Sequence, residues 1–99
     1  MLQAQIYFDK DELLNLRPLH EFILEFLIKQ HIQGATLFKG MAGFGPNHRL
    51  KLPNALFSFD DVPMVITFID ERAKVEQTLT ELRKEVKTGL IVTAEVKAW

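Results

Sequence analysis

The chain opens with a strict alternation of apolar and polar side chains. Every second residue from position 2 to position 8 is apolar: Leu2, Ala4, Ile6 and Phe8. The residues between them are two glutamines and a tyrosine. A period of two places successive side chains on opposite faces of an extended strand. The pattern predicts a first strand over residues 2–8 with one face in the core.

Two later segments have a helical period instead. The first is RPLHEFILEFLIKQHI, residues 17–32, in which Pro18 suits an early helical position. Its regularly spaced apolar residues are Leu19, Phe22, Ile23, Phe26 and Leu27. The second is ERAKVEQTLTELRKEV, residues 71–86, whose apolar stripe consists of Val75, Leu79, Leu82 and Val86. We expect Gly34 to stop the first helix and Asp70 to cap the second.

Three further segments are typical of strands. ATLFKGMAGF, residues 35–44, predicts a second strand whose far end is weakened by Gly40 and Gly43. VPMVITFID, residues 62–70, is almost continuously apolar, which predicts a central third strand covered on both faces. LIVTAEVKAW follows Gly89 and predicts the last strand. Between the second and third strands, residues 45–61 have no regular pattern, and we expect a long mobile loop there.

The predicted order is βαββαβ in a single domain, residues 1–99. Two interleaved βαβ units give an α+β, ferredoxin-like fold, with a four-stranded antiparallel sheet and both helices on one face. Two strands carry apolar residues in both alternating sets: Met64, Val65, Ile66, Phe68, Ile69, Leu90, Ile91 and Val92. The second apolar face predicts that another subunit covers it. The wide apolar arc of the first helix has two explanations: contact with a neighbouring subunit, or deeper burial in its own core.

Composition and charge exclude several classes of function. The 99 residues carry a net charge of −1 with no basic cluster, so we expect no nucleic-acid binding. The absence of cysteine excludes disulfides and thiolate chemistry. The chain has neither a signal peptide nor an apolar run of the ~18 residues that a membrane span needs. We therefore expect a cytoplasmic protein without membrane insertion.

Candidate chemistry is sparse. The stretch GMAGFG, residues 40–45, matches neither the P-loop nor the Rossmann spacing, so its glycines serve either strand geometry or the root of a recognition loop. His20 and His31 are separated by about 16 Å of helix, too far for one metal ion within one chain. Ser58 has no implied base, and the paired carboxylates Asp60 and Asp61 are typical of turns. We expect no enzymatic activity and no bound metal.

Four blocks of the sequence together carry a family resemblance. IYFDKDELLNLRPLHEFIL, GATLFKGMAGFG, FSFDDVPMVITFIDE and GLIVTAEV resemble the PII-like family of uncharacterised proteins, which is related to nitrogen-regulatory PII and CutA-type proteins. The resemblance covers nearly the whole chain. It implies a compact homotrimer of ferredoxin-like subunits in which residues 45–61 correspond to the PII T-loop.

The resemblance also implies a function. It is that of a regulatory or signalling protein that binds an adenine nucleotide or another small anionic ligand in the clefts between subunits. The long loop, residues 45–61, would act on a partner protein whose identity the sequence does not give. The ligand-binding residues predicted on this basis are Gly43, Gly45, Arg49, Lys87, Thr88 and Gly89. The nucleotide is a ligand here, and no cofactor is implied.

The sequence departs from the PII pattern at defined positions. The phosphate-binding loop before the last strand is reduced to EVKTGL, and Lys51 stands where relatives often have histidine. The sole tyrosine, Tyr7, belongs to the first strand, so uridylylation of a loop tyrosine is not expected. A metal- or ion-linked trimer of the CutA kind is the alternative function. An acylphosphatase-like activity fits the size and strand order, but Arg17 lacks a glycine-rich, phosphate-cradling approach.

Overall fold

The computed structural model describes residues 1–44, 48, 50 and 63–99. Its main sheet contains β1 (Leu2–Asp9), β4 (Ala35–Lys39), β5 (Pro63–Asp70) and β6 (Leu90–Glu95). The helices are α1 (Leu19–Lys29) and α2 (Arg72–Glu85), and a small hairpin consists of β2 (Leu13–Leu14) and β3 (Arg17–Pro18). The predicted loop over residues 45–61 lies outside the described residues except for His48 and Leu50.

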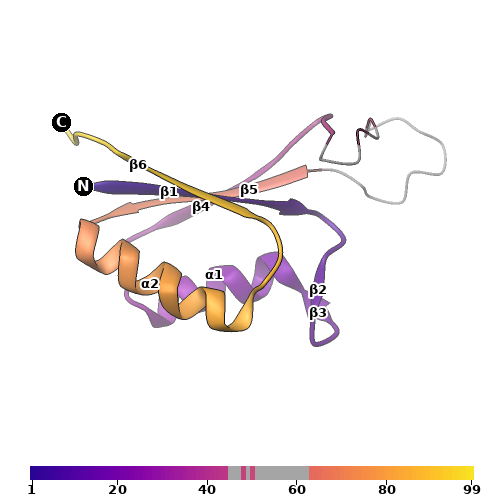
Figure 1. Ribbon diagram of the computed structural model, residues 1–99, viewed down its shortest axis with the longest axis horizontal. Helices are drawn as coiled ribbons and strands as arrows, with labels where there is room; N and C mark the ends of the chain where they lie inside the picture. Colours follow the sequence, from indigo (N-terminus) through magenta and orange to yellow (C-terminus); the bar gives the residue numbers. More distant parts are fainter. Residues whose placement is uncertain (45–47, 49, 51–62) are drawn as a thin grey trace.

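The strand order in the main sheet is β4-β5-β1-β6, and every neighbouring pair is antiparallel. Both helices cover the same face of this sheet, and the other face is open (Figure 1). The two termini lie close together at the end of the sheet where β1 begins and β6 ends (Figure 1). This arrangement confirms the predicted ferredoxin-like βαββαβ fold.

The alternation in β1 has the predicted consequence. Its four apolar residues are all buried: Leu2, Ala4, Ile6 and Phe8. They pack with the inward-facing residues of β5, which are Met64, Ile66 and Phe68. Strand pairing aligns these side chains, since Ile6 lies opposite Ile66 and Phe8 opposite Met64. The inward faces of the two inner strands, β1 and β5, therefore form the sheet side of the core.

The two helices close the core with narrow stripes. The buried residues of α1 are Leu19, Ile23 and Leu27, one or two turns apart. Of the other residues that widen the apolar arc of α1, Leu24 is half-buried and Ile28 is 71% exposed. Phe22 and Phe26 of the regular stripe are half-buried and stack with ring centroids 6.0 Å apart. The helix α2 buries Val75, Thr78 and Leu82, while the predicted Leu79 is half-buried against the core. Thr78 is a core position that the apolar pattern missed.

Two predicted helix boundaries were wrong by a few residues. The helix α1 ends at Lys29, and His31, with φ of 62°, takes the left-handed conformation that was expected near Gly34. The N-cap of α2 is Glu71, and its side chain makes no capping hydrogen bond. Asp70 instead ends β5 and is buried. Its buried carboxylate is satisfied because it accepts backbone N–H groups from two different segments.

The third predicted strand is central, as expected, because β5 lies between β4 and β1. It is not covered on both faces within one chain, since Ile69 is 41% exposed on the open side. The hairpin β2–β3 was not predicted at all. Asn15 and Leu16 form its tip with φ angles of 52° and 67°, which is typical of a two-residue hairpin turn. Only Asn15 signals such a turn in the sequence.

Candidate functional site

The predicted ligand residues that the structure describes lie at one end of the sheet. Gly43 lies against Pro63, the first residue of β5, and Gly89 lies against Tyr7, near the end of β1. The two glycines are on opposite sides of this end, with β5 and β1 between them. Three strand spacings, about 14 Å in total, separate β4 from β6 in the sheet. Gly45 and Arg49 lie outside the described residues.

The glycines after β4 allow a close backbone approach. The N–H of Gly40 donates to the carbonyl of Pro63 at 2.7 Å. A Cβ on Gly40 would lie 2.8 Å from Pro63 Cγ, and one on Gly43 would lie 3.1 Å from the same atom. These distances support the structural explanation of the glycine cluster. A role of Gly43 in ligand binding stays a prediction.

The turn before β6, residues 86–89, is held by an arginine that the sequence analysis did not single out. Arg83, in the last turn of α2, donates through Nη1 to the carbonyls of Val86 at 3.3 Å and Thr88 at 2.7 Å. Its Nη2 donates to the carbonyl of Gly89 at 3.1 Å. A guanidinium has donors in a planar fork, so one side chain fixes three carbonyl groups. The available signal was a basic residue near a helix C-terminus, which is too common to be diagnostic.

Gly89 has a position that other residues cannot take. Its φ is 80°, and a Cβ there would lie 2.8 Å from the carbonyl oxygen of Tyr7. Left-handed backbone and the contact with β1 both require glycine. The turn is consequently pressed against β1 at the point where β6 joins the sheet.

The remaining polar contact of this turn is with an acidic residue. The hydroxyl of Thr88 donates to Glu12 Oε2 at 2.6 Å, across 76 positions of sequence. Glu12 also anchors the hairpin, since its carbonyl accepts the N–H of Leu19 at 2.8 Å. Within the described residues, no hydrogen bond uses the N–H groups of Lys87, Thr88 or Gly89. As far as the described residues extend, the turn thus presents unused N–H donors, with one carboxylate beside them.

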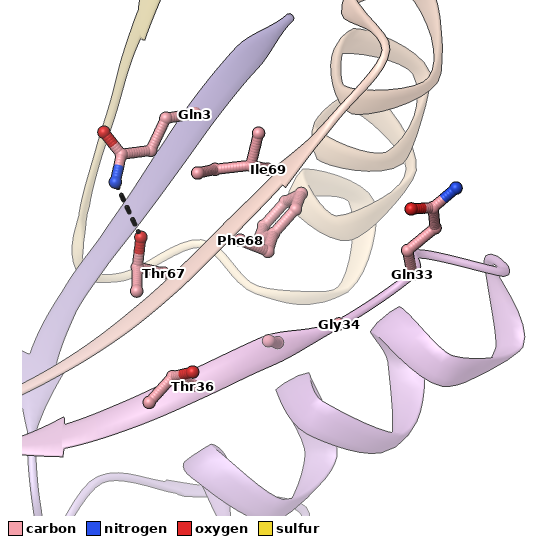
Figure 2. A pocket seen from close by; sticks show the side chains of 8 residues that line it. Gln3, Gln33, Gly34, Thr36, Thr67, Phe68 and Ile69 are labelled. Atoms are coloured by element: carbon pink, nitrogen blue, oxygen red, sulfur yellow. Dashed lines mark hydrogen bonds between the residues drawn. The ribbon is translucent and has the colours of Figure 1, made fainter. Parts of the chain in front are cut away.

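A second feature lies at the opposite end of the sheet, where β4 begins. An open groove of about 510 Å³ lies where the start of β4 meets the end of β5. Figure 2 shows Gln3, Thr67 and Thr36 around it, with Gln3 Nε2 donating to Thr67 Oγ1 at 3.2 Å. The full lining is Gln3, Gln33, Gly34, Ala35, Thr36, Thr67, Phe68 and Ile69. These residues carry no charge, and nothing in the sequence pattern indicated that they would meet.

Asp70 shapes the same end of the sheet. Its Oδ2 accepts the N–H of Gln33 at 3.2 Å, and its Oδ1 accepts the N–H of Glu71 at 2.8 Å. Burial raises the pKa of this carboxyl, but the two N–H donors and the charge of Lys74, 3.6 Å away, outweigh burial and lower it. Asp70 is therefore an ionised structural group.

Metal ligation has little support in the part of the chain that the structure describes. No group of three His, Asp or Glu side chains in these ranges is arranged to hold an ion. His20 has a buried Nδ1 without a hydrogen-bond partner, and His31 is exposed beyond the end of α1. None of the helices within the described ranges combines the length and the apolar character needed to cross a bilayer.

Comparison with known proteins identifies the family. The model of the DUF190 family, described as "Uncharacterized ACR, COG1993", matches residues 1–98, and the chain belongs to this family. Two proteins of Aquifex aeolicus named UPF0166 protein are similar to it. One is 27% identical, covering 94% of this chain and 88% of its own. The other is 30% identical, covering 96% and 93%.

Solved structures are similar in fold at low sequence identity. CPII, a nitrogen regulatory PII-like protein from Thiomonas intermedia bound to ADP, AMP and bicarbonate, has a TM-score of 0.63 and 14% identity, covering 93% of this chain and 86% of that one. A PII-like signaling protein from Thermus thermophilus has a TM-score of 0.63 and 12% identity, covering 94% and 81%. CutA1 from Pyrococcus horikoshii has a TM-score of 0.67 and 14% identity, covering 100% and 86%.

Proposed function

We propose that this member of the DUF190 family is a PII-like regulatory protein. It assembles as a homotrimer, binds an adenine nucleotide or another small anionic ligand between subunits, and acts on a partner protein through residues 45–61. It works by binding and not by catalysis, in the cytoplasm. The observation that carries the proposal is an apolar row across the open face of the sheet.

This open-face row runs through all four strands. Register places Phe38 beside Val65, Val65 beside Tyr7, and Tyr7 beside Leu90. Phe38 and Leu90 are 57% and 59% exposed. Four large side chains in line across an uncovered sheet are typical of a surface that another protein covers. A second copy of the chain is the simplest partner to cover this open-face row.

The edges of the sheet support a closed ring. The edge strands β4 and β6 run in opposite directions, because β4 is antiparallel to β5, β5 to β1 and β1 to β6. Around a symmetry axis roughly parallel to the strands, β4 of one copy can pair antiparallel with β6 of the next. Such a head-to-tail contact forms a ring when the rotation closes. Three copies close it in the assembly that we propose.

The ligand site belongs to the boundary between subunits. The N–H groups of residues 87–89, which bind none of the described residues, can approach phosphate oxygens, and Lys87 is exposed beside them. We assign Gly43, Gly45 and Arg49 to the same ligand from the neighbouring copy, because three strand spacings, about 14 Å, separate Gly43 from Gly89 within one sheet. The likeness to CPII, which binds ADP and AMP, supports an adenine nucleotide. Thr88 must release Glu12 before its hydroxyl can contact phosphate.

Calorimetry with ATP, ADP and AMP tests the ligand. Losing one charge-assisted contact in Arg49→Ala should weaken binding roughly tenfold to a hundredfold, about 1.5–3 kcal/mol. Arg49→Lys should also weaken binding, because an ammonium lacks the planar fork. Absence of heat with all three nucleotides would remove the nucleotide from the proposal. Light scattering at micromolar concentration tests the trimer separately.

A CutA-like metal- or ion-linked trimer is the second candidate, favoured by the fold similarity to CutA1 over the whole chain. Titration with divalent transition metals, followed by light scattering, distinguishes it from the first. Metal-dependent assembly without nucleotide binding would favour the CutA-like function. An acyl phosphate assay checks that the protein has no hydrolase activity.

A further inference from the structure

We infer that the groove at the start of β4 is a docking site for the C-terminal segment of a second copy, residues 96–99, with Trp99 as its anchor. The inference rests on the proposed ring, because it names what one subunit inserts into the next. It assigns a role to the groove and to the exposed tryptophan, neither of which takes part in the candidate ligand site.

Trp99 is the sole tryptophan of the chain, and it is fully exposed. Its ring meets Lys97, whose Nζ lies 5.3 Å from the ring centroid, but no other side-chain contact buries it. A tryptophan has the largest apolar surface of any side chain, and such residues dominate the energetics of interfaces when they enter a pocket. An exposed tryptophan such as Trp99 is therefore a candidate anchor for an interface.

The segment that carries Trp99 leaves the sheet at the end where the groove lies. Its first residue is tied there, since the N–H of Val96 donates to the carbonyl of Met1 at 3.0 Å. Glu95 pairs with Leu2 at the start of β1, and the groove-lining Gln3 is the next residue of that strand. Figure 1 shows the C-terminal segment continuing beyond β6 at the end of the sheet where β1 begins.

The directions of the strands bring one copy's segment to the groove of the next copy. When β6 lies antiparallel beside β4 of a neighbour, the C-terminal end of β6 is next to the N-terminal end of β4. The groove is at that N-terminal end, lined by Gly34, Ala35 and Thr36. Four extended residues after Glu95 span roughly 13–14 Å, which is enough to enter it.

The groove suits an indole better than a charged group. Ile69, which is 41% exposed on the open face, gives the groove apolar surface, and Figure 2 shows Gln3, Thr36 and Thr67 along its sides. Amide and hydroxyl oxygens can accept the indole N–H, while the ring covers apolar surface. The space beside Gly34 is open, because no atom lies within 4 Å of the position that a Cβ would take there.

Fluorescence of the full-length chain tests the docking directly, since all tryptophan emission comes from Trp99. We expect blue-shifted, quencher-protected emission in the assembled protein and a red shift on dilution to single subunits. The variant Gly34→Lys places a cation at the groove, and its Cβ meets no atom of the subunit within 4 Å. It should expose Trp99 and weaken assembly, as should Trp99→Ala, which we expect to weaken it roughly thirtyfold or more.

Ala73→Lys is the matched control, because it adds the same charge at an exposed position of α2. It should retain both the blue-shifted emission and the assembly. Emission of a fully exposed indole in an assembled protein would overturn the docking and leave the proposed ring intact. Protected emission that changes neither on dilution nor in the Gly34→Lys variant would overturn the docking as well, because Trp99 would then be buried against its own subunit. Single subunits at all concentrations would overturn the ring and the docking together.

Discussion

The carboxylate of Asp70 accepts the backbone N–H of Gln33 at 3.2 Å, and this bond joins the end of β5 to the connection between α1 and β4. The same carboxylate binds the N–H of Glu71 at the start of α2. A buried side chain thus ties three elements together at the groove end of the sheet. Both N–H groups would lose their partner if the carboxylate were removed.

Asp70→Ala should lower the free energy of unfolding by about 1–3 kcal/mol, because it leaves partly buried donors unpaired. Urea denaturation measures the change. Glu71→Ala is the matched control, since Glu71 is exposed and its side chain makes no capping bond, and it should change stability by less than about 0.5 kcal/mol. Equal effects of the two variants would contradict the role of Asp70.

Asp70 should also make stability depend on pH in a defined range. Its pKa is lowered in the folded chain relative to the unfolded value of about 3.9, so its contribution is fully present above that value. The contribution is lost as the pH falls below about 4, toward the folded pKa. The free energy of unfolding, measured between pH 6 and 3 in steps of about 0.5 pH units, should decline less steeply in Asp70→Asn than in the wild type. Parallel curves would indicate that Asp70 has the same pKa in both states.

Two glycines should respond oppositely to alanine. Gly89→Ala forces a side chain into left-handed backbone and against the carbonyl of Tyr7, which should cost at least about 1–2 kcal/mol. Gly34→Ala meets no atom within 4 Å and has no left-handed φ. It should be neutral or stabilising by up to about 1 kcal/mol, because it restricts the unfolded chain. Thermal unfolding of both variants provides the measurement. Destabilisation by Gly34→Ala would contradict the open space and the ordinary backbone conformation at this position.

Phe38→Asp should disrupt assembly without unfolding the subunit. Phe38 is 57% exposed on β4, so the subunit loses little buried surface, while the open-face row acquires a charge at its edge. Sedimentation velocity should show single subunits, with the circular dichroism of the wild type. Lys39→Asp provides the control, because Lys39 is the next residue, is exposed and is not part of the row. A Phe38→Asp variant that still assembles would place the interface elsewhere.

Glu12→Gln should strengthen nucleotide binding if phosphate approaches the turn at residues 86–89. Glutamine still accepts the hydroxyl of Thr88, so the turn keeps its geometry, but the negative charge beside the phosphates is removed. We expect affinity to increase about twofold to fivefold, in line with the energy of an exposed charge pair. Glu85→Gln, in the last turn of α2, is the control and should change affinity less. Unchanged affinity in Glu12→Gln would place the phosphates away from Thr88.

The helices, the strands of the main sheet and the fold class follow from patterns within single segments of the sequence. The alternation from Leu2 to Phe8 and the stripe from Val75 to Val86 depend only on which side chains avoid water, and each is read within one segment. The order of those segments then left few arrangements, and the ferredoxin-like sheet was among them. The family resemblance pointed to the same fold. Boundaries were less certain, because His31 could take the left-handed conformation expected at Gly34.

Contacts between residues far apart in the sequence depend on the tertiary structure. Glu12 and Thr88 are 76 positions apart, and Asp70 and Gln33 are 37 apart. Neither pair has a spacing that a local pattern encodes, because the sheet order brings the partners together. The groove at Gly34 arises in the same way, from the point where β4 and β5 stop pairing. Periodicity reports the burial of a side chain, whereas hydrogen-bond partners and cavities depend on how complete elements pack in space.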